Sequence, residues 1–224
     1  MNNIKIGIVD DDKTHVTDIK RVFSRYAKVE DTSLSFVFES FYKDENSDYE
    51  TLLHDILEAI KNETVDCLII DYQLIFVQEA NTGADVINVI RDILPAFPCI
   101  ILTGRGDECA KEFSVDPDKI YIKEEFLAIG KECSNALVKK IVANVMMVKQ
   151  KKQKLIAEIG VLKEQLKGDI DNTKVNGIIE NIIELESKLD KYCMVGQSEM
   201  DKIYNSSSLE KIVSLIEQAN KLLN

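Results

Sequence analysis

The sequence lacks tryptophan, has only two histidines and three prolines, and its five cysteines form no CxxC pair. Zinc sites use cysteine and histidine at short regular spacings, so this composition argues against one. The odd, scattered cysteines fit reduced thiols in a cytoplasm and suggest no disulfide framework. No apolar run approaches the ~20 residues that a membrane helix needs, and the N-terminal run is too short for a secretory signal. We therefore expect a cytoplasmic protein that does not contact membranes.

Acidic residues outnumber basic ones by 39 to 28, and the excess is unevenly distributed. Residues 1–130 carry a net charge of −13, whereas residues 131–224 carry +2. Phosphate contacts supply most of the affinity of nucleic-acid-binding proteins, so an acidic chain is poorly suited to that role. No arginine, the residue that most often reads base edges, follows Arg105. A nucleic-acid-binding output is therefore only an alternative interpretation.

The pattern of the chain changes near residue 130. All three prolines and five of the nine glycines lie before residue 131, and only helical periodicity follows. We therefore divide the chain into a domain at residues 1–128 and a helical region at 129–224. Apolar residues spaced by three or four predict a long helix ending near Leu166 and a shorter one over 178–192. A third helix is predicted after the capping box of Ser207 and Glu210.

The spacing in the 178–192 helix is close to a heptad repeat, which predicts coiled-coil packing. Such helices can pack within one chain or across a homodimer, and both arrangements stay open.

Five short apolar segments in the first domain predict buried β-strands, at residues 4–9, 34–41, 65–70, 98–102 and 119–122. Amphipathic helical patterns lie between several of them, at residues 16–26, 49–61 and 83–94. Strands that alternate with helices are typical of a parallel sheet covered on both faces. The sequence thus predicts an α/β fold with a doubly wound, flavodoxin-like five-stranded parallel sheet, followed by an all-helical segment.

Chemically active side chains follow four of these strands: Asp10 with Asp11, Asp71, Thr103 and Lys123. The carboxyl ends of parallel strands meet at one edge of a sheet, which is where ligands bind in such folds. Three carboxylates in one pocket repel one another, and Mg²⁺ would relieve that repulsion. A carboxylate beside Mg²⁺ can attack a phosphoryl group while an ammonium offsets charge on the phosphoryl oxygens. The predicted pocket therefore suits the formation of an aspartyl phosphate.

These residues resemble the signature of the receiver domain of two-component response regulators. The resemblance covers about residues 4–127 and rests on four segments in the right order, each at a predicted strand end. The segments are Val9-Asp10-Asp11, Ile69-Ile70-Asp71, Leu102-Thr103-Gly104 and Ile122-Lys123.

The resemblance implies that Asp71 accepts a phosphoryl group from a phosphohistidine, carried by a histidine kinase or a phosphotransfer protein. It implies that Asp11 and Asp71 bind Mg²⁺, with Asp10 acting mainly through water. The backbone carbonyl of Gln73 would complete the metal site. No enzymatic activity beyond this self-catalysed transfer is expected, and the output would be protein–protein contacts of the C-terminal helices.

The resemblance also implies that Thr103 moves toward the phosphoryl group and that Lys123 pairs with it. Family members usually have a proline shortly after the acceptor aspartate and another directly after the lysine. In this chain residues 72–75 contain no proline, and Glu124 follows Lys123. Ile120 stands where the family usually has an aromatic residue. None of these departures removes a group from the pocket, so the phosphorylation chemistry is still expected.

A second family is a weaker match. Residues 6–14 fit the hhhhDxDxT motif of haloacid-dehalogenase-like phosphatases, with Asp10 as nucleophile and Asp12 as acid/base. That family places its last acidic motif after the lysine, and only Glu124 and Glu125 and then helices follow Lys123. We therefore rank this interpretation below the receiver.

Simpler interpretations also exist for individual residues. Residues 10–12 suit the start of a helix, where acidic side chains cap free backbone N–H groups. His15 and His54 are interpreted as incidental, and His54 lies in a predicted helix with no obvious partner. The lysine-rich run at 149–154 is typical of a solvated helix face.

Overall fold

The computed structural model describes residues 2–41, 48–74, 82–104, 116–166 and 172–194. The chain forms two compact units. The first comprises Met1–Gln153 with Lys191–Cys193, and the second comprises Lys154–Asp190 with Met194–Asn224.

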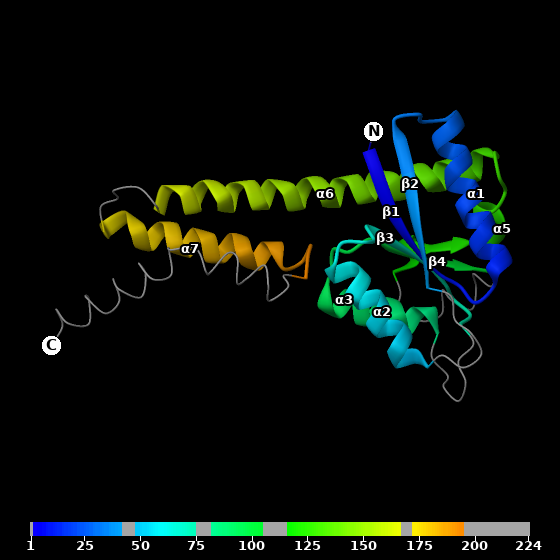
Figure 1. The fold of residues 1–224 in the computed structure, drawn as a ribbon, viewed down its shortest axis with the longest axis horizontal. Coiled ribbons are helices and arrows are strands. Elements are labelled where there is room, and N and C mark those ends of the chain that lie inside the picture. Colours follow the sequence, from blue (N-terminus) through cyan, green and yellow to red (C-terminus); the bar gives the residue numbers. More distant parts are fainter. Residues whose placement is uncertain (1, 42–47, 75–81, 105–115, 167–171, 195–224) are drawn as a thin grey trace. The chain divides into compact units, whose positions relative to one another are not determined.

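The first unit is built on a five-stranded, all-parallel sheet in the order β2-β1-β3-β4-β5 (Figure 1). The strands are β1 (Asn2–Val9), β2 (Leu34–Phe41), β3 (Cys67–Asp71), β4 (Cys99–Thr103) and β5 (Ile120–Ile122). The predicted fold class, a doubly wound parallel sheet followed by helices, is confirmed. β3 and β4 each extend one residue beyond the predicted strand, because backbone pairing continues past the apolar run: the Tyr72 N–H donates to the Leu102 carbonyl at 3.0 Å.

Helices cover both faces of this sheet (Figure 1). α1 and the first part of α6 pack on one face, and α2 and α3 lie on the other. The helices of this unit are α1 (Lys13–Val29), α2 (Tyr49–Lys61), α3 (Gly83–Ile93), the 3₁₀ turn η1 (Pro117–Lys119), α5 (Lys123–Phe126) and residues 132–153 of α6 (Glu132–Leu166).

The largest core cluster joins the sheet to α1 and α6. Phe23 of α1 and Phe126 of α5 are fully buried there, with ring centroids 5.8 Å apart. Val138, Ile141 and Val145 bring α6 into the same cluster. Burying a side chain of this size contributes about 1.5–3 kcal/mol, so the first part of α6 is an integral layer of the first unit.

Two lysines attach α6 to the amino edge of the sheet. The Lys149 ammonium lies 2.6 Å from the Asp66 carboxylate and donates to the Asn3 carbonyl at 3.2 Å. The same Asp66 carboxylate accepts the backbone N–H of Lys5 at 2.8 Å. Lys152 forms a further ion pair with Glu63. The predicted solvated face of residues 149–154 therefore carries specific contacts at two of its lysines.

Two cysteines are buried inside the sheet. Cys67 and Cys99 are the first residues of β3 and β4 and have 0% and 1% of their surface exposed. Burial raises the pKa of the Cys99 thiol to about 12 and raises that of Cys67 well above its usual value. Cys133, at the start of α6, is exposed.

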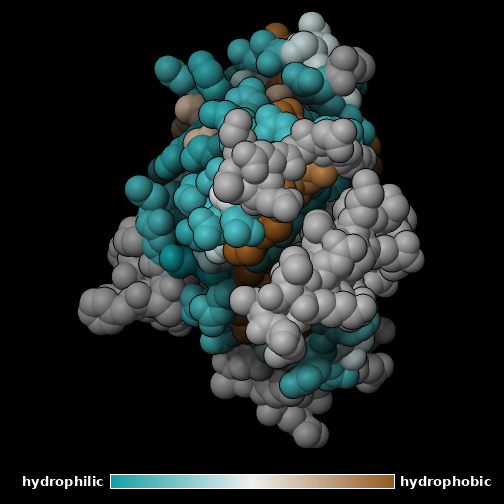
Figure 2. Space-filling view, turned by 90° about the vertical axis from the view of Figure 1, so that its left-hand side faces the viewer, coloured by the Kyte–Doolittle hydropathy of each residue, from teal (hydrophilic) through white to brown (hydrophobic). Residues whose placement is uncertain are grey.

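In the second unit, residues 154–166 of α6 pack against α7 (Asn172–Leu189). Ile159 and Ile182 are buried, and Lys163 pairs with Glu186 at 2.8 Å. Val161 and Ile183 expose 59% and 60% of their surface. On the face that Figure 2 draws, hydrophobic side chains are visible between hydrophilic ones.

The predicted third helix, with Ser207 and Glu210, lies outside the described residues. Within the part of the chain that the structure describes, no helix is both long and apolar enough to cross a membrane.

Candidate functional site

The register of the sheet brings Asp10 and Asp71 together. Val9 of β1 pairs with Ile70 of β3, so the next residue of each strand lies at the same height on the carboxyl edge. The chain leaves β1 through α1 on one face of the sheet and reaches β3 from α2 on the other. In open α/β sheets, ligands bind at the carboxyl ends of two adjacent strands whose connections run on opposite faces of the sheet.

The same register brings Thr103 and Lys123 to this edge. Thr103, the last residue of β4, pairs with Ile122 of β5 and is 1% exposed. Lys123 follows directly and begins α5. Four of the predicted pocket residues therefore share one edge of the sheet, as the sequence pattern indicated.

The Lys123 ammonium lies between the two carboxylates. Its Nζ is 2.9 Å from Asp71 Oδ1 and 3.4 Å from Asp10 Oδ2. The Lys123, Asp71 and Asp10 side chains are only 11%, 10% and 1% exposed. Buried charges are tolerated when an opposite charge and hydrogen bonds compensate them. Lys123 provides that compensation for both carboxylates.

The electrostatic environment raises the pKa of the Asp71 carboxyl. Burial is the largest cause, and the negative charges of Asp10 and Asp11 add to it. The hydrogen bond and positive charge of Lys123 oppose this shift without cancelling it. A carboxyl group whose pKa is perturbed by burial and a specific partner, at a ligand-binding edge, is a candidate functional group.

The loop after β1 holds Asp10 in place. The Asp12 backbone N–H donates to Asp10 Oδ1 at 2.9 Å. The Asp12 side chain caps α1 by accepting the Thr14 N–H at 2.7 Å, and this bond is the main reason that its pKa is lowered. Helix capping therefore accounts for Asp12 and coexists with a site at Asp10.

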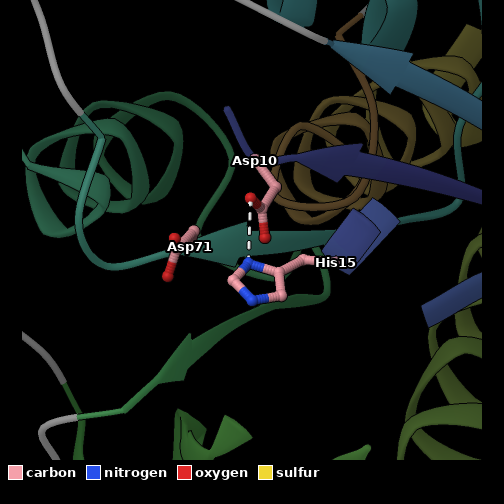
Figure 3. A group of neighbouring side chains, drawn as sticks. All are labelled: Asp10, His15 and Asp71. Carbon is pink, nitrogen blue, oxygen red and sulfur yellow. Dashed lines mark ion pairs between the residues drawn. The ribbon is translucent and has the colours of Figure 1, made fainter. Parts of the chain in front are cut away.

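The structure adds His15 to this site. Its Nδ1 lies 3.2 Å from Lys123 Nζ, 3.6 Å from Asp10 Oδ1 and 3.7 Å from Asp12 Oδ2. Figure 3 shows the imidazole, carried by α1, beside the Asp10 carboxylate, with Asp71 at the end of the neighbouring strand.

His15 therefore has charged neighbours that the sequence alone did not reveal. The available signal was its place in the first turn of the helix that follows β1, a turn that lies against the strand end. His54, by contrast, is 74% exposed on α2 and lies 3.6 Å from the carboxylate of its neighbour Asp55, which is also exposed.

Among the described residues, Asp10, His15 and Asp71 form a group that could hold a metal ion. One ligand atom of each lies within 4.8 Å of the others. Two carboxylates and an imidazole are donors that divalent cations accept, so these residues fit such an ion. Asp11 acts on Asp71 through its charge but is not part of this group, and Gln73 is exposed just beyond β3.

Gly83 keeps the start of α3 close to the end of β3. Its N–H donates to the Tyr72 carbonyl at 3.0 Å. A Cβ at this position would collide with the Asp71 carbonyl oxygen and lie 2.9 Å from Cγ2 of Ile70. The absence of a side chain at residue 83 thus allows the backbone approach that positions Asp71.

No protein-family model matches this sequence, and no curated protein matches it closely enough to count as a relative. Flavodoxin-like folds carry many unrelated activities, so the fold alone assigns none. The function must therefore be argued from the residues at the carboxyl edge.

Proposed function

We propose that the first unit is a receiver domain of the two-component type, a switch that accepts a phosphoryl group on Asp71 and is controlled by it. The observation that carries this proposal is the position of the Lys123 ammonium between Asp71 and Asp10 at the carboxyl edge. An acceptor carboxylate, a cation for phosphoryl oxygens and further oxygen ligands lie within a few ångströms. This set matches the chemistry of phosphoryl transfer to a carboxylate.

In the proposed reaction, a carboxylate oxygen of Asp71 attacks the phosphorus of a phosphohistidine on a histidine kinase or phosphotransfer protein. The O–P bond forms as the P–N bond breaks, and the electron pair passes to the imidazole nitrogen of the donor. Lys123 binds a phosphoryl oxygen, and the Thr103 hydroxyl donates a hydrogen bond to another.

A divalent cation belongs to this proposal, and Mg²⁺ is the ion that the receiver resemblance implies. Asp10, Asp11 and Asp71, with the backbone carbonyl of Gln73, would hold it. When bound, it would offset the carboxylate charges and polarise the phosphoryl group.

The route from the site to the helices supports an output through α6. Lys123 begins α5, and one turn later Phe126 enters the core cluster that α6 shares. The buried Ser134 hydroxyl of α6 donates to the Phe126 carbonyl at 2.7 Å. Phosphorylation adds charge that attracts Lys123, so a shift of Lys123 acts directly on the packing of α6.

We therefore propose that the C-terminal helices provide the output by contacting a protein partner or a second copy of the chain. The exposed Val161 and Ile183 are apolar residues available for such contacts. The proposal places the protein in the cytoplasm and assigns it no enzymatic output. Nucleic-acid binding is less well supported, given the acidic charge balance.

The test is intact-mass spectrometry of the full chain after incubation with acetyl phosphate and Mg²⁺, with EDTA as the metal-free control. We expect the mass of one HPO₃ to be added only with Mg²⁺. Asp71→Asn should abolish the gain, whereas Asp55→Asn, at an exposed carboxylate on α2, should preserve it. Labelling that persists in Asp71→Asn, or no labelling of the unaltered chain with either Mg²⁺ or Mn²⁺, would contradict the proposal.

A further inference from the structure

The three side chains that could hold a metal already surround a cation. The Lys123 ammonium contacts Asp71 at 2.9 Å, Asp10 at 3.4 Å and His15 Nδ1 at 3.2 Å. These partners come from the ends of β3 and β1 and from the first turn of α1. Residues from three separate elements thus converge on a single positive centre.

We propose that His15 is a metal ligand and that Asp10, His15 and Asp71 make this a site for a divalent transition metal, such as Mn²⁺, Fe²⁺ or Co²⁺, in preference to Mg²⁺. This deepens the proposed function by naming the class of ion at the same site. It adds a nitrogen donor that a site made only of carboxylate and carbonyl oxygens lacks.

The donor chemistry separates these ions. Mg²⁺ is a hard cation that binds oxygen ligands and keeps several waters. Imidazole binds first-row transition metals well, and their affinity for a nitrogen-containing site rises along the series from Mn²⁺ to Cu²⁺. An imidazole within 4.8 Å of both carboxylates therefore strengthens the binding of transition metals, while it adds little to the binding of Mg²⁺.

The position of His15 is determined by its surroundings. Asp12 caps α1 and fixes the turn that carries His15, and the same loop orients Asp10. About a third of the His15 side chain is exposed, at 36%, so an ion from solvent can reach it. Because Lys123 contacts all three ligands, an incoming divalent ion takes over the charge compensation and releases the ammonium.

The experiment measures nitrogen coordination directly. Mn²⁺ is added to the tag-free full chain, and pulsed EPR detects the modulation from a coordinated imidazole nitrogen. The chain has only two histidines, so ¹⁵N-histidine labelling and two variants assign the signal completely. We expect the imidazole signal in the unaltered chain and in His54→Ala, and its loss in His15→Ala.

Titrations with Mn²⁺ and with Mg²⁺ provide the second measurement. His15→Ala should weaken Mn²⁺ binding by about tenfold or more, since even partners that only orient a ligand have effects of that size. Mg²⁺ binding should change far less. Circular dichroism and thermal melts of each variant establish that it is folded. An equal loss for both ions, or an Mn²⁺ spectrum without histidine nitrogen, would overturn the proposal.

These outcomes are independent of the phosphorylation test. Labelling of Asp71 without histidine coordination would leave the proposed function standing and remove His15 as a ligand. Histidine coordination without labelling under any metal would establish the metal site and contradict the receiver function.

Discussion

The Lys123 ammonium and the Asp71 carboxylate lie 2.9 Å apart although their strands are not neighbours, because β4 separates β3 from β5. Asp71 is the last residue of its strand, and Lys123 is the first residue after its own. The long lysine side chain spans the intervening strand end. The pair therefore couples the centre of the sheet to the segment that leads into α6.

Removing Lys123 should destabilise the metal-free protein. In Lys123→Ala, Asp71 and Asp10 lose their shared ammonium, and breaking a buried ion pair typically costs about 3 kcal/mol. Urea unfolding in EDTA measures this loss. Saturating Mn²⁺ or Mg²⁺ should restore part of it, because an ion that binds the folded state stabilises it. Lys139→Ala, at an exposed position on α6, is the control, and equal stability of the two variants would contradict the prediction.

Asp71→Asn should raise the thermal stability of the metal-free protein at neutral pH. The pKa of Asp71 is raised in the folded state, mainly by burial, so its charged form is less favourable there than in the unfolded chain. Stability therefore falls as the pH rises from the ordinary value of 3.8 through the folded pKa.

The asparagine side chain of Asp71→Asn does not titrate, so its stability lacks this pH dependence. The higher thermal stability of the variant should therefore vanish below pH 3.8, where Asp71 of the unaltered chain is neutral in both the folded and the unfolded state. Thermal melts of both proteins in EDTA across this range make the measurement. A melting temperature of Asp71→Asn below that of the unaltered chain at pH 7 would contradict the prediction.

Gly83→Ala should disturb the site through the backbone. The new Cβ would meet the Asp71 carbonyl oxygen, and overpacking of this kind costs about 1–3 kcal/mol. The variant should also bind divalent ions more weakly, as measured by titration calorimetry. Gly177→Ala is the matched control, because it lies in α7 with open space around it. An exposed helix position should gain up to about 1 kcal/mol from alanine.

Lys149→Ala should loosen the first part of α6. Its ammonium bridges the Asp66 carboxylate and the Asn3 carbonyl, and it is partly exposed, so we expect a loss of about 1 kcal/mol. Hydrogen exchange of amides in residues 138–153 should accelerate, while exchange in α2 should not change. Uniform acceleration across the sheet would instead indicate global destabilisation.

The strand ends were predictable because each apolar run is short and stops at a polar residue. Asp10, Asp71, Thr103 and Lys123 needed only the rule that parallel strands end at one edge. His15 was not predictable in the same way. Its contacts depend on how the first turn of α1 folds back over β1, and periodicity alone does not contain that geometry.

The extent of α6 shows a second limit of sequence periodicity. Its apolar stripe predicted a long helix, which the structure confirms as 35 residues. The stripe did not tell which partner each segment packs against. Val138 and Val145 join the sheet core, whereas Ile159 is buried in the second unit. A helix that serves two units looks the same as one that serves a single unit when only its spacing is known.

The two buried thiols of the central strands act as an internal reporter of sheet opening. Only a thiolate reacts readily with alkylating reagents, and Cys67 and Cys99 are both inaccessible and held in the thiol form. They can be modified only when β3 and β4 separate from their neighbours, whereas Cys133 reacts at the surface. The rate at which these two thiols are alkylated, followed by mass spectrometry, therefore reports how often the strand that carries Asp71 opens. If a bound ion slows this labelling, the ratio of the rates measures how much the ion stabilises the closed sheet.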